Sequence, residues 1–309
     1  MRIIVTGSSG QIGTNLALTF MAAGDTVLGI DIRPNSWDSS IHTERIDLLD
    51  LTALDTWRPP FAPDCIVHLA AWAKVHELVE DPRKAYENVA IAFSALELAR
   101  RLDCPFAFGS SREVYGDVVR ESTGEAAADF VVAQSPYSAS KIAGEAMLAA
   151  YGRCYDIPYV TFRFSNVYGR YDNDLHRMER VVPLFVRRIN DRAPVTVFGE
   201  DKLLDFTYVD DCTAGIHAGV QKLVGGAIAN ETINLGSGLG STLLDLVHLI
   251  ETNIGKEALV RTAPSRRGEV TRYVANISNA RQKLGYEPKF TLADGIASYV
   301  RWCEATGWL

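Results

Sequence analysis

The sequence contains little cysteine, and its few cysteines form no Cys-x-x-Cys pair: Cys65, Cys104, Cys154, Cys212 and Cys303. An odd number at such wide spacing disfavours a disulfide-stapled fold and a zinc site, so no metal is expected. The chain also lacks an apolar run near the roughly 20 residues that a membrane-spanning helix needs. Met1 leads directly into a strand-like segment, without a cationic and apolar leader. We therefore expect a cytoplasmic protein.

Basic residues are fewer than acidic ones. Lys and Arg number 31 against 38 Asp and Glu, which gives a formal net charge of -7. A general nucleic-acid binder or a membrane-surface protein would need a basic face, so neither partner is expected. An anionic nucleotide remains possible, because a pocket needs only a few local donors. With 309 residues, of which 47% are apolar, the chain can form a large α/β domain alone or with a smaller one.

Short β-branched runs alternate with longer helical patterns in the first half of the chain. Such alternation predicts an α/β fold of the Rossmann type, a doubly wound parallel sheet with a ligand crevice at the carboxyl ends of its strands. The strand-like runs are residues 3–5, 26–30, 65–69, 106–108 and 159–162, and the helical ones are residues 11–23, 82–102 and 138–155.

The pattern changes after about Gly169. The sequence then predicts a helix over 181–190, a strand over 195–198, a helix from Asp211, a strand over 232–235 and two later helices. We interpret residues 1–168 as a nucleotide-binding domain. Residues 169–309 are interpreted mainly as a smaller α/β lobe that binds substrate, with some segments returning to the main sheet.

A glycine-rich segment, Gly7-Ser8-Ser9-Gly10-Gln11-Ile12-Gly13, joins the first strand to the first helix. Glycine suits a tight turn, close approach of the backbone to a pyrophosphate, and close packing of helix on strand. Asp31 ends the second strand-like run, where a carboxylate can bind both ribose hydroxyls and repel a 2′-phosphate. NAD is therefore the preferred cofactor, and Arg33 leaves NADP possible.

A second motif, Tyr137-Ser138-Ala139-Ser140-Lys141, follows the plausible helix start Ser135-Pro136. Residues i and i+4 of a helix share a face, so Tyr137 and Lys141 point into the same space. A phenol titrates near pH 10, and a nearby ammonium with the positive nicotinamide ring would lower its pKa toward the working range. Ser111, just past a predicted strand, could hydrogen-bond the hydroxyl that Tyr137 deprotonates.

These motifs resemble those of the NAD-dependent nucleotide-sugar epimerases and dehydratases, an extended short-chain dehydrogenase/reductase family. The resemblance covers nearly the whole chain and includes the segments 163–169, 205–211 and 266–270. Within this family the chain looks like a UDP-sugar 4-epimerase. The resemblance implies that Tyr137 is the acid/base, that Lys141 is its electrostatic partner and that Ser111 positions the reacting hydroxyl.

The resemblance also implies two sets of binding residues. In the first, glycines and Ile12 line the pyrophosphate, Asp31 the ribose, and Asp47 and Leu48 the adenine. The full set for NAD is Gly7, Gly10, Gln11, Ile12, Asp31, Asp47, Leu48, Leu69, Ala70, Ala71, Lys74, Asn88, Tyr137 and Lys141. The residues expected to contact a nucleotide-diphosphate sugar are Ser111, Arg112, Asn166, Val182 and Arg266.

The reaction depends on the neighbours of the catalytic set. By resemblance, Tyr137 takes a sugar hydroxyl proton while hydride passes to NAD, which gives a 4-keto sugar. We favour 4-epimerisation of a UDP-hexose or UDP-hexuronate. Family dehydratases usually carry Asp-Glu where this chain has Arg112-Glu113, which counts against the usual dehydratase mechanism. Glu113 still fits a decarboxylase or an unusual dehydratase, or serves the loop alone, and Arg112 could meet a carboxylate such as that of glucuronate.

Two functions of other classes also fit these motifs. A reductase could use the same Ser/Tyr/Lys set, and a non-catalytic protein could bind NAD through the same turn. The family commonly has an Arg where this chain has Leu204, and Lys202 or Arg266 could replace it. A homodimer through helices 82–102 and 138–155 is expected by resemblance. Packing on the sheet accounts equally well for their apolar residues, which are Ala85, Val89, Ala92, Leu96, Ala143, Met147 and Ala150.

Overall fold

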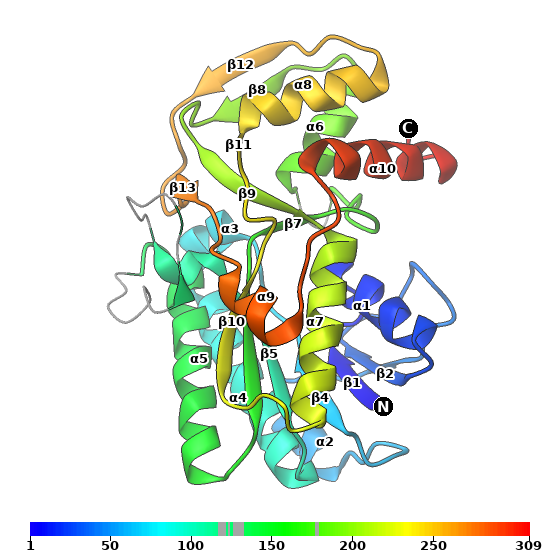
Figure 1. Ribbon diagram of the computed structural model, residues 1–309, viewed down its shortest axis with the longest axis vertical. Coiled ribbons are helices and arrows are strands. Elements are labelled where there is room, and N and C mark those ends of the chain that lie inside the picture. Colours follow the sequence, from blue (N-terminus) through cyan, green and yellow to red (C-terminus); the bar gives the residue numbers. More distant parts are fainter. Residues whose placement is uncertain (117–121, 123, 126–132, 177–178) are drawn as a thin grey trace.

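The computed structural model describes residues 1–116, 122, 124–125, 133–176 and 179–309. Its centre is a seven-stranded sheet in the order β10-β6-β5-β4-β1-β2-β3, in which every neighbouring pair is parallel (Figure 1). This confirms the predicted Rossmann-type fold. The strands are β1 (Arg2–Thr6), β2 (Thr26–Asp31), β3 (Thr43–Arg45), β4 (Cys65–His68), β5 (Phe106–Ser111), β6 (Tyr159–Phe164) and β10 (Glu231–Leu235).

Helices cover both faces of this sheet. On one face lie α1 (Gln11–Ala22), α7 (Val209–Val224) and α9 (Ser278–Leu284); on the other lie α2 (Leu51–Thr56), α4 (Arg83–Leu102) and α5 (Pro136–Cys154). In β1, Ile3 and Val5 belong to the first core and Ile4 to the second. Successive side chains of a strand point to opposite faces, so a strand covered on both sides must be apolar throughout.

Two element ends that differ from the sequence prediction carry the candidate site. Helix α5 begins at Pro136 rather than at 138, because Ser135 and Ser138 form a capping box and Pro136 occupies the first turn, where no N–H donor is needed. Strand β5 continues to Ser111, three residues beyond the predicted end. The short helix η1 (Arg112–Tyr115) follows directly, with Ser111 as its N-cap.

The second lobe, at the top of Figure 1, is built on two small sheets. Strand β9 (Leu203–Tyr208), which the sequence did not predict, pairs with β7 (Asn166–Tyr168), β11 (Gly240–Thr242) and β13 (Arg272–Tyr273). Strand β8 (Val195–Phe198) pairs with β12 (Val260–Ala263). The lobe's helices are α6 (Val181–Asn190), α8 (Leu243–Ile254) and α10 (Leu292–Ala305). With α9, three helices follow β10 in the described part of the chain, where two were predicted.

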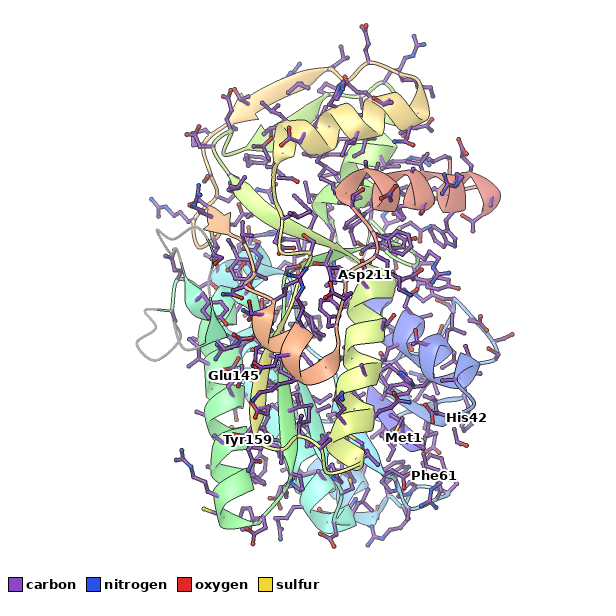
Figure 2. All side chains as sticks on the ribbon, viewed as in Figure 1. Met1, His42, Phe61, Glu145, Tyr159 and Asp211 are labelled. Carbon is purple, nitrogen blue, oxygen red and sulfur yellow. The ribbon has the colours of Figure 1, made fainter. Side chains whose placement is uncertain are left out.

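The two halves are interwoven. Strand β10 pairs with β6 of the main sheet, and α7 packs beside α1. Asp211, labelled at the upper end of α7 in Figure 2, accepts backbone hydrogen bonds from Lys289 (2.8 Å) and Phe290 (3.0 Å). Segments from the second half of the chain thus belong to the main sheet layer, and the domain boundary between residues 168 and 169 stays a prediction. None of the described helices combines the length and apolar character needed to cross a bilayer.

Candidate active site

A cavity of about 740 Å³ lies where the carboxyl ends of the main strands face the second lobe. Main-sheet segments that follow β1, β2, β4 and β5 line it on one side, and β8, β9, α6 and the residues Arg266, Glu269 and Val270 line it on the other. It brings together nearly all of the predicted site residues, namely Gly7, Gly10, Gln11, Ile12, Asp31, Asp47, Leu48, Leu69, Ala70, Ala71, Lys74, Ser111, Arg112, Glu113, Tyr137, Lys141, Asn166, Val182 and Arg266.

The glycine-rich turn after β1 fits a pyrophosphate. Gly7 has φ of +74°, and a Cβ at this position would lie 2.6 Å from the backbone N of Ala70. A side chain is therefore excluded on both conformational and steric grounds. Gly10 is the N-cap of α1, so the first-turn N–H groups of a twelve-residue helix are not covered by a capping side chain.

Asp31, at the end of β2, fits a ribose. It is 8% exposed and lines the cavity. Its two carboxylate oxygens accept backbone hydrogen bonds from Ser9 (3.0 Å) and Arg33 (3.1 Å), and Arg33 Nε lies 3.8 Å from Oδ1. Each carboxylate oxygen keeps further acceptor capacity, so sugar hydroxyls can still bind.

Two polar residues lie behind the cavity wall rather than on it. Asn88 was predicted to bind NAD. Its side chain accepts a hydrogen bond from Trp72 N (2.7 Å) and donates one to Trp72 O (3.0 Å), so it holds the loop after β4 in position. His68 is 1% exposed and stacks on Phe108. Burial, with a smaller contribution from Lys141, lowers the pKa of His68 to about 3. His68 is therefore neutral and belongs to the core.

Tyr137 and Lys141 lie one turn apart on α5, and both are buried. Lys141 Nζ donates to the carbonyl of Gly109 in β5 (2.8 Å) and lies 5.9 Å from the centroid of the Tyr137 ring. A close fit of α5 on β5 makes this possible, since a Cβ on Gly144 would lie 2.6 Å from the Phe108 ring. Ser111, at the end of β5, completes the set that was predicted.

The two titratable groups of this set are shifted in opposite directions. Burial raises the pKa of Tyr137 to about 12, with hydrogen bonding to Ser111 opposing the shift, Glu113 adding to it, and Arg180 and Arg112 also opposing it. Burial lowers the pKa of Lys141 to about 8, against the effect of Glu145. Without bound ligands the phenol is therefore protonated at neutral pH, and a further positive charge is needed to favour phenolate.

Next to Ser111, Arg112 and Glu113 form an ion pair on the cavity wall. Arg112 Nη2 lies 3.1 Å from Glu113 Oε1, and the side chains are 12% and 5% exposed. The Arg112 guanidinium also lies 5.9 Å from the centroid of the Tyr273 ring. The Arg112 guanidinium is thus held by the carboxylate of Glu113 and by the ring of Tyr273.

Sequence reasoning missed several residues of this cavity. Arg180, the N-cap of α6, contacts Gln11 Oε1 and lies 3.4 Å from Asp172 Oδ1. Phe198 lies under the Arg266 guanidinium, with 4.2 Å between the guanidinium carbon and the ring centroid. Neither Arg180 nor Phe198 belongs to a recognised motif. In the sequence they differ from other residues only in lying at the end of a predicted helix or strand. Lys202, a candidate to replace the usual family arginine, also lines the cavity and pairs with Glu269 (2.6 Å).

A dinucleotide turn at α1, an acid after β2 and a Ser/Tyr/Lys set on one cavity define the class of the short-chain dehydrogenases/reductases. Within this class, residues 3–236 match the model of the NAD dependent epimerase/dehydratase family. The chain belongs to this family and is an NAD-dependent enzyme.

Relatives in this family align along the whole chain. A probable UDP-glucuronate 4-epimerase of Rhizobium meliloti is 29% identical, covering 98% of this chain and 97% of its own. The structure of a UDP-glucose 4-epimerase from Thermotoga maritima with UDP-glucose superposes with a TM-score of 0.91, at 28% identity and 99% coverage of both chains. A UDP-glucuronic acid 4-epimerase from Bacillus cereus, in complex with UDP-glucuronic acid and NAD, has a TM-score of 0.87 at 27% identity, covering 99% of this chain and 100% of that one.

Proposed function

We propose that this enzyme is a nucleotide-sugar 4-epimerase that acts on a UDP-hexose or UDP-hexuronate through a transient 4-keto sugar. One observation carries the proposal: a single cavity is lined by the dinucleotide turn, by Ser111, Tyr137 and Lys141, and by side chains of the second lobe. Cofactor, reacting groups and substrate can therefore meet in one place. The UDP-sugar names of the relatives support the choice of substrate class.

The chain's own residues hold and move the proton. Tyr137 takes the proton of the sugar 4-hydroxyl and later returns it, and Ser111 orients that hydroxyl by hydrogen bonding. The ammonium of Lys141 favours the phenolate through its charge. NAD, when bound, supplies the hydride acceptor and donor.

The remaining site residues divide between the two ligands. The turn after β1, Asp31, Asp47 and Leu48, the segment after β4 and Lys74 would bind NAD, with Asn88 supporting that segment through Trp72. The substrate-binding residues are proposed to be Ser111, Arg112, Asn166, Val182 and Arg266. Asp31→Ala is expected to weaken NAD binding much more than NADP binding, and equal losses would remove Asp31 from the ribose-reading role.

Glu113 supports a second candidate function. It is 4% exposed and lines the cavity. Its negative charge adds to the effect of burial in raising the pKa of Tyr137. An acidic group so close to the reacting phenol could act as a base in dehydration across C5 and C6. The same site could decarboxylate a 4-keto hexuronate.

One experiment separates these reactions. The purified protein and NAD are incubated with UDP-glucose, UDP-glucuronate and dTDP-glucose, and products are identified by mass spectrometry and proton NMR. Unchanged mass with a new configuration at C4 supports the epimerase. Loss of water or carbon dioxide overturns it in favour of the second candidate, and no reaction with any sugar argues against both.

We further propose a cytoplasmic homodimer that associates through α4 and α5. Ala92 and Leu96 of the predicted surface are buried in the core of the chain itself. However, Tyr86 and Phe93 on α4 are 75% and 39% exposed and lie seven residues, or about two turns, apart. Sedimentation analysis of the wild type and of Tyr86→Glu would test this, and a monomeric wild type would contradict it.

A further inference from the structure

Arg112 occupies a distinctive place on the catalytic wall. It follows Ser111 directly in the chain, lines the same cavity and contributes to the electrostatic environment of Tyr137. Its guanidinium is fixed between the carboxylate of Glu113, 3.1 Å from Nη2, and the ring of Tyr273. The side chain is therefore pre-organised rather than free to turn into solvent.

This guanidinium has hydrogen-bonding capacity that the protein does not fill. Nη1 is buried, yet among the described residues it has no hydrogen-bond partner. A buried donor without an acceptor is costly, and a charged acceptor satisfies a guanidinium better than a neutral one. The side chain as a whole is 12% exposed and lines the cavity, so a ligand carboxylate can approach the cavity-facing part of the guanidinium, whose fork its two oxygens match.

The position of Arg112 indicates which part of the sugar it would meet. In the proposed function, Ser111 and Tyr137 bind the hydroxyl on C4, and the neighbouring ring carbon, C5, carries the C6 group. We propose that Arg112 recognises a C6 carboxylate, so that the enzyme prefers nucleotide hexuronates to nucleotide hexoses. This inference rests on the proposed function, because that function places the 4-hydroxyl at Ser111.

The charges around the site are compatible with an anionic sugar. Arg112 and Arg180 each have a carboxylate partner, Glu113 and Asp172 respectively. Lys141 instead donates to a backbone carbonyl, and no salt bridge to it is found in the described part of the chain. Protonated Lys141 therefore forms no ion pair, although Glu145 acts on it through space, and its charge would favour an anionic sugar over a neutral one.

The test measures binding to the NAD-loaded enzyme by calorimetry, with UDP, UDP-glucose and UDP-glucuronate as probes. The wild type should bind UDP-glucuronate about 10- to 100-fold more tightly than UDP-glucose. In Arg112→Gln this ratio should fall to within about threefold of unity, while the affinity for UDP stays within about threefold of the wild type. Lys202→Gln is the matched control, since it removes another carboxylate-paired cation of this cavity and should leave the ratio unchanged.

Each outcome has a defined meaning. A wild-type ratio near or below one overturns the inference even if Arg112→Gln fails to fold, and so does a ratio that survives the substitution. Turnover of the same ligands then distinguishes the two proposals. Equal 4-epimerisation of both sugars keeps the proposed function and rejects the role of Arg112. Preferred binding of UDP-glucuronate followed by loss of carbon dioxide keeps the role of Arg112 and rejects epimerisation.

Discussion

The two walls of the cavity differ in how firmly their polar groups are held. Behind the wall formed by β5 and α5, Glu145 accepts hydrogen bonds from Ser110 (2.5 Å) and from Arg163 (2.6 Å), and Arg163 also donates to Tyr115 (2.9 Å). Figure 2 labels Glu145 on α5, two turns beyond Tyr137. On the second-lobe wall, Arg266 is partly exposed and contacts the Phe198 ring.

This difference suggests a division of labour. Interlocked hydrogen bonds, buried or partly buried, keep α5, β5, β6 and η1 in one arrangement, which suits groups that must meet a reacting atom within a narrow range of positions. On the second lobe Arg266 contacts a ring instead of joining such a network, which suits recognition of a nucleotide. Substitutions on the first wall should therefore change the rate of reaction, and those on the second wall should change affinity.

The largest effect is expected from Tyr137→Phe on the first wall. Removing the phenolic oxygen removes the acid/base group, so kcat should fall by about 10²–10⁴-fold while NAD still binds. Kinetics with UDP-glucuronate and titration with NAD would measure the two quantities. Tyr151→Phe is a matched control, because Tyr151 lies on the same helix but hydrogen-bonds Glu97, outside the cavity. A Tyr137→Phe enzyme with a near-normal rate would exclude the proposed mechanism.

A smaller loss, with a distinctive pH dependence, is expected from Lys141→Met. Without the ammonium the phenolate is less favoured, so the pKa of Tyr137 rises and kcat at pH 7 should fall by about 10²-fold. Activity should keep increasing up to pH 10 without levelling off, because a larger fraction of the phenol is ionised at each higher pH. A kcat profile from pH 6 to 10 checks this, and an unshifted acid limb would argue against the electrostatic role of Lys141.

Stability gives an independent check on the same lysine. Burial lowers the pKa of Lys141 to about 8, so the folded protein releases this proton before the unfolded chain, in which lysine titrates near 10.4, does. Between these values the unfolded state binds more protons, and the contribution of Lys141 to the free energy of unfolding increases with pH. Lys141→Met should lack this gain between pH 8 and 10, as measured by urea denaturation.

The network behind the first wall predicts a loss of stability. Arg163→Met would leave the carboxylate of Glu145, whose side chain is only 16% exposed, without its cation, and we expect the free energy of unfolding to fall by about 3 kcal/mol. Arg83→Met removes an ion pair with Asp81 in which the arginine side chain is 86% exposed, and should leave the free energy of unfolding nearly unchanged because solvent screens the pair. Similar values for both variants in urea denaturation would show that the first wall is less tightly held than we infer.

The same contrast explains which parts were predictable from the sequence. Tyr137 and Lys141 are related by the helical repeat, and Gly7 and Asp31 by the ends of two consecutive strands, so short-range rules could place them. The family resemblance added residues such as Asn166 and Arg266, which the cavity does contain. For Asn88 the resemblance pointed to the cofactor, yet its amide is used by the backbone of Trp72.

The second lobe was harder to predict because its contacts join distant segments. Strand β9 pairs with residues from three separate parts of the chain, and no local pattern reports such pairing. Arg180 reaches Gln11 across 169 residues of sequence. Neither the hydrophobic periodicity of the sequence nor a motif identifies Arg180 as a site residue. Its position in the cavity is visible only in the tertiary structure.

The smallest effect is expected on the second wall, from Arg266→Ala. If Arg266 binds the substrate diphosphate, its removal should weaken binding of UDP and raise the KM for UDP-sugar by about 10-fold, with kcat within about threefold of the wild type. Arg267→Ala is the matched control, because Arg267 is its exposed neighbour and does not line the cavity. A large fall in kcat with unchanged UDP affinity would mean that the second lobe takes part in the reaction itself, and the division between the two walls would no longer hold.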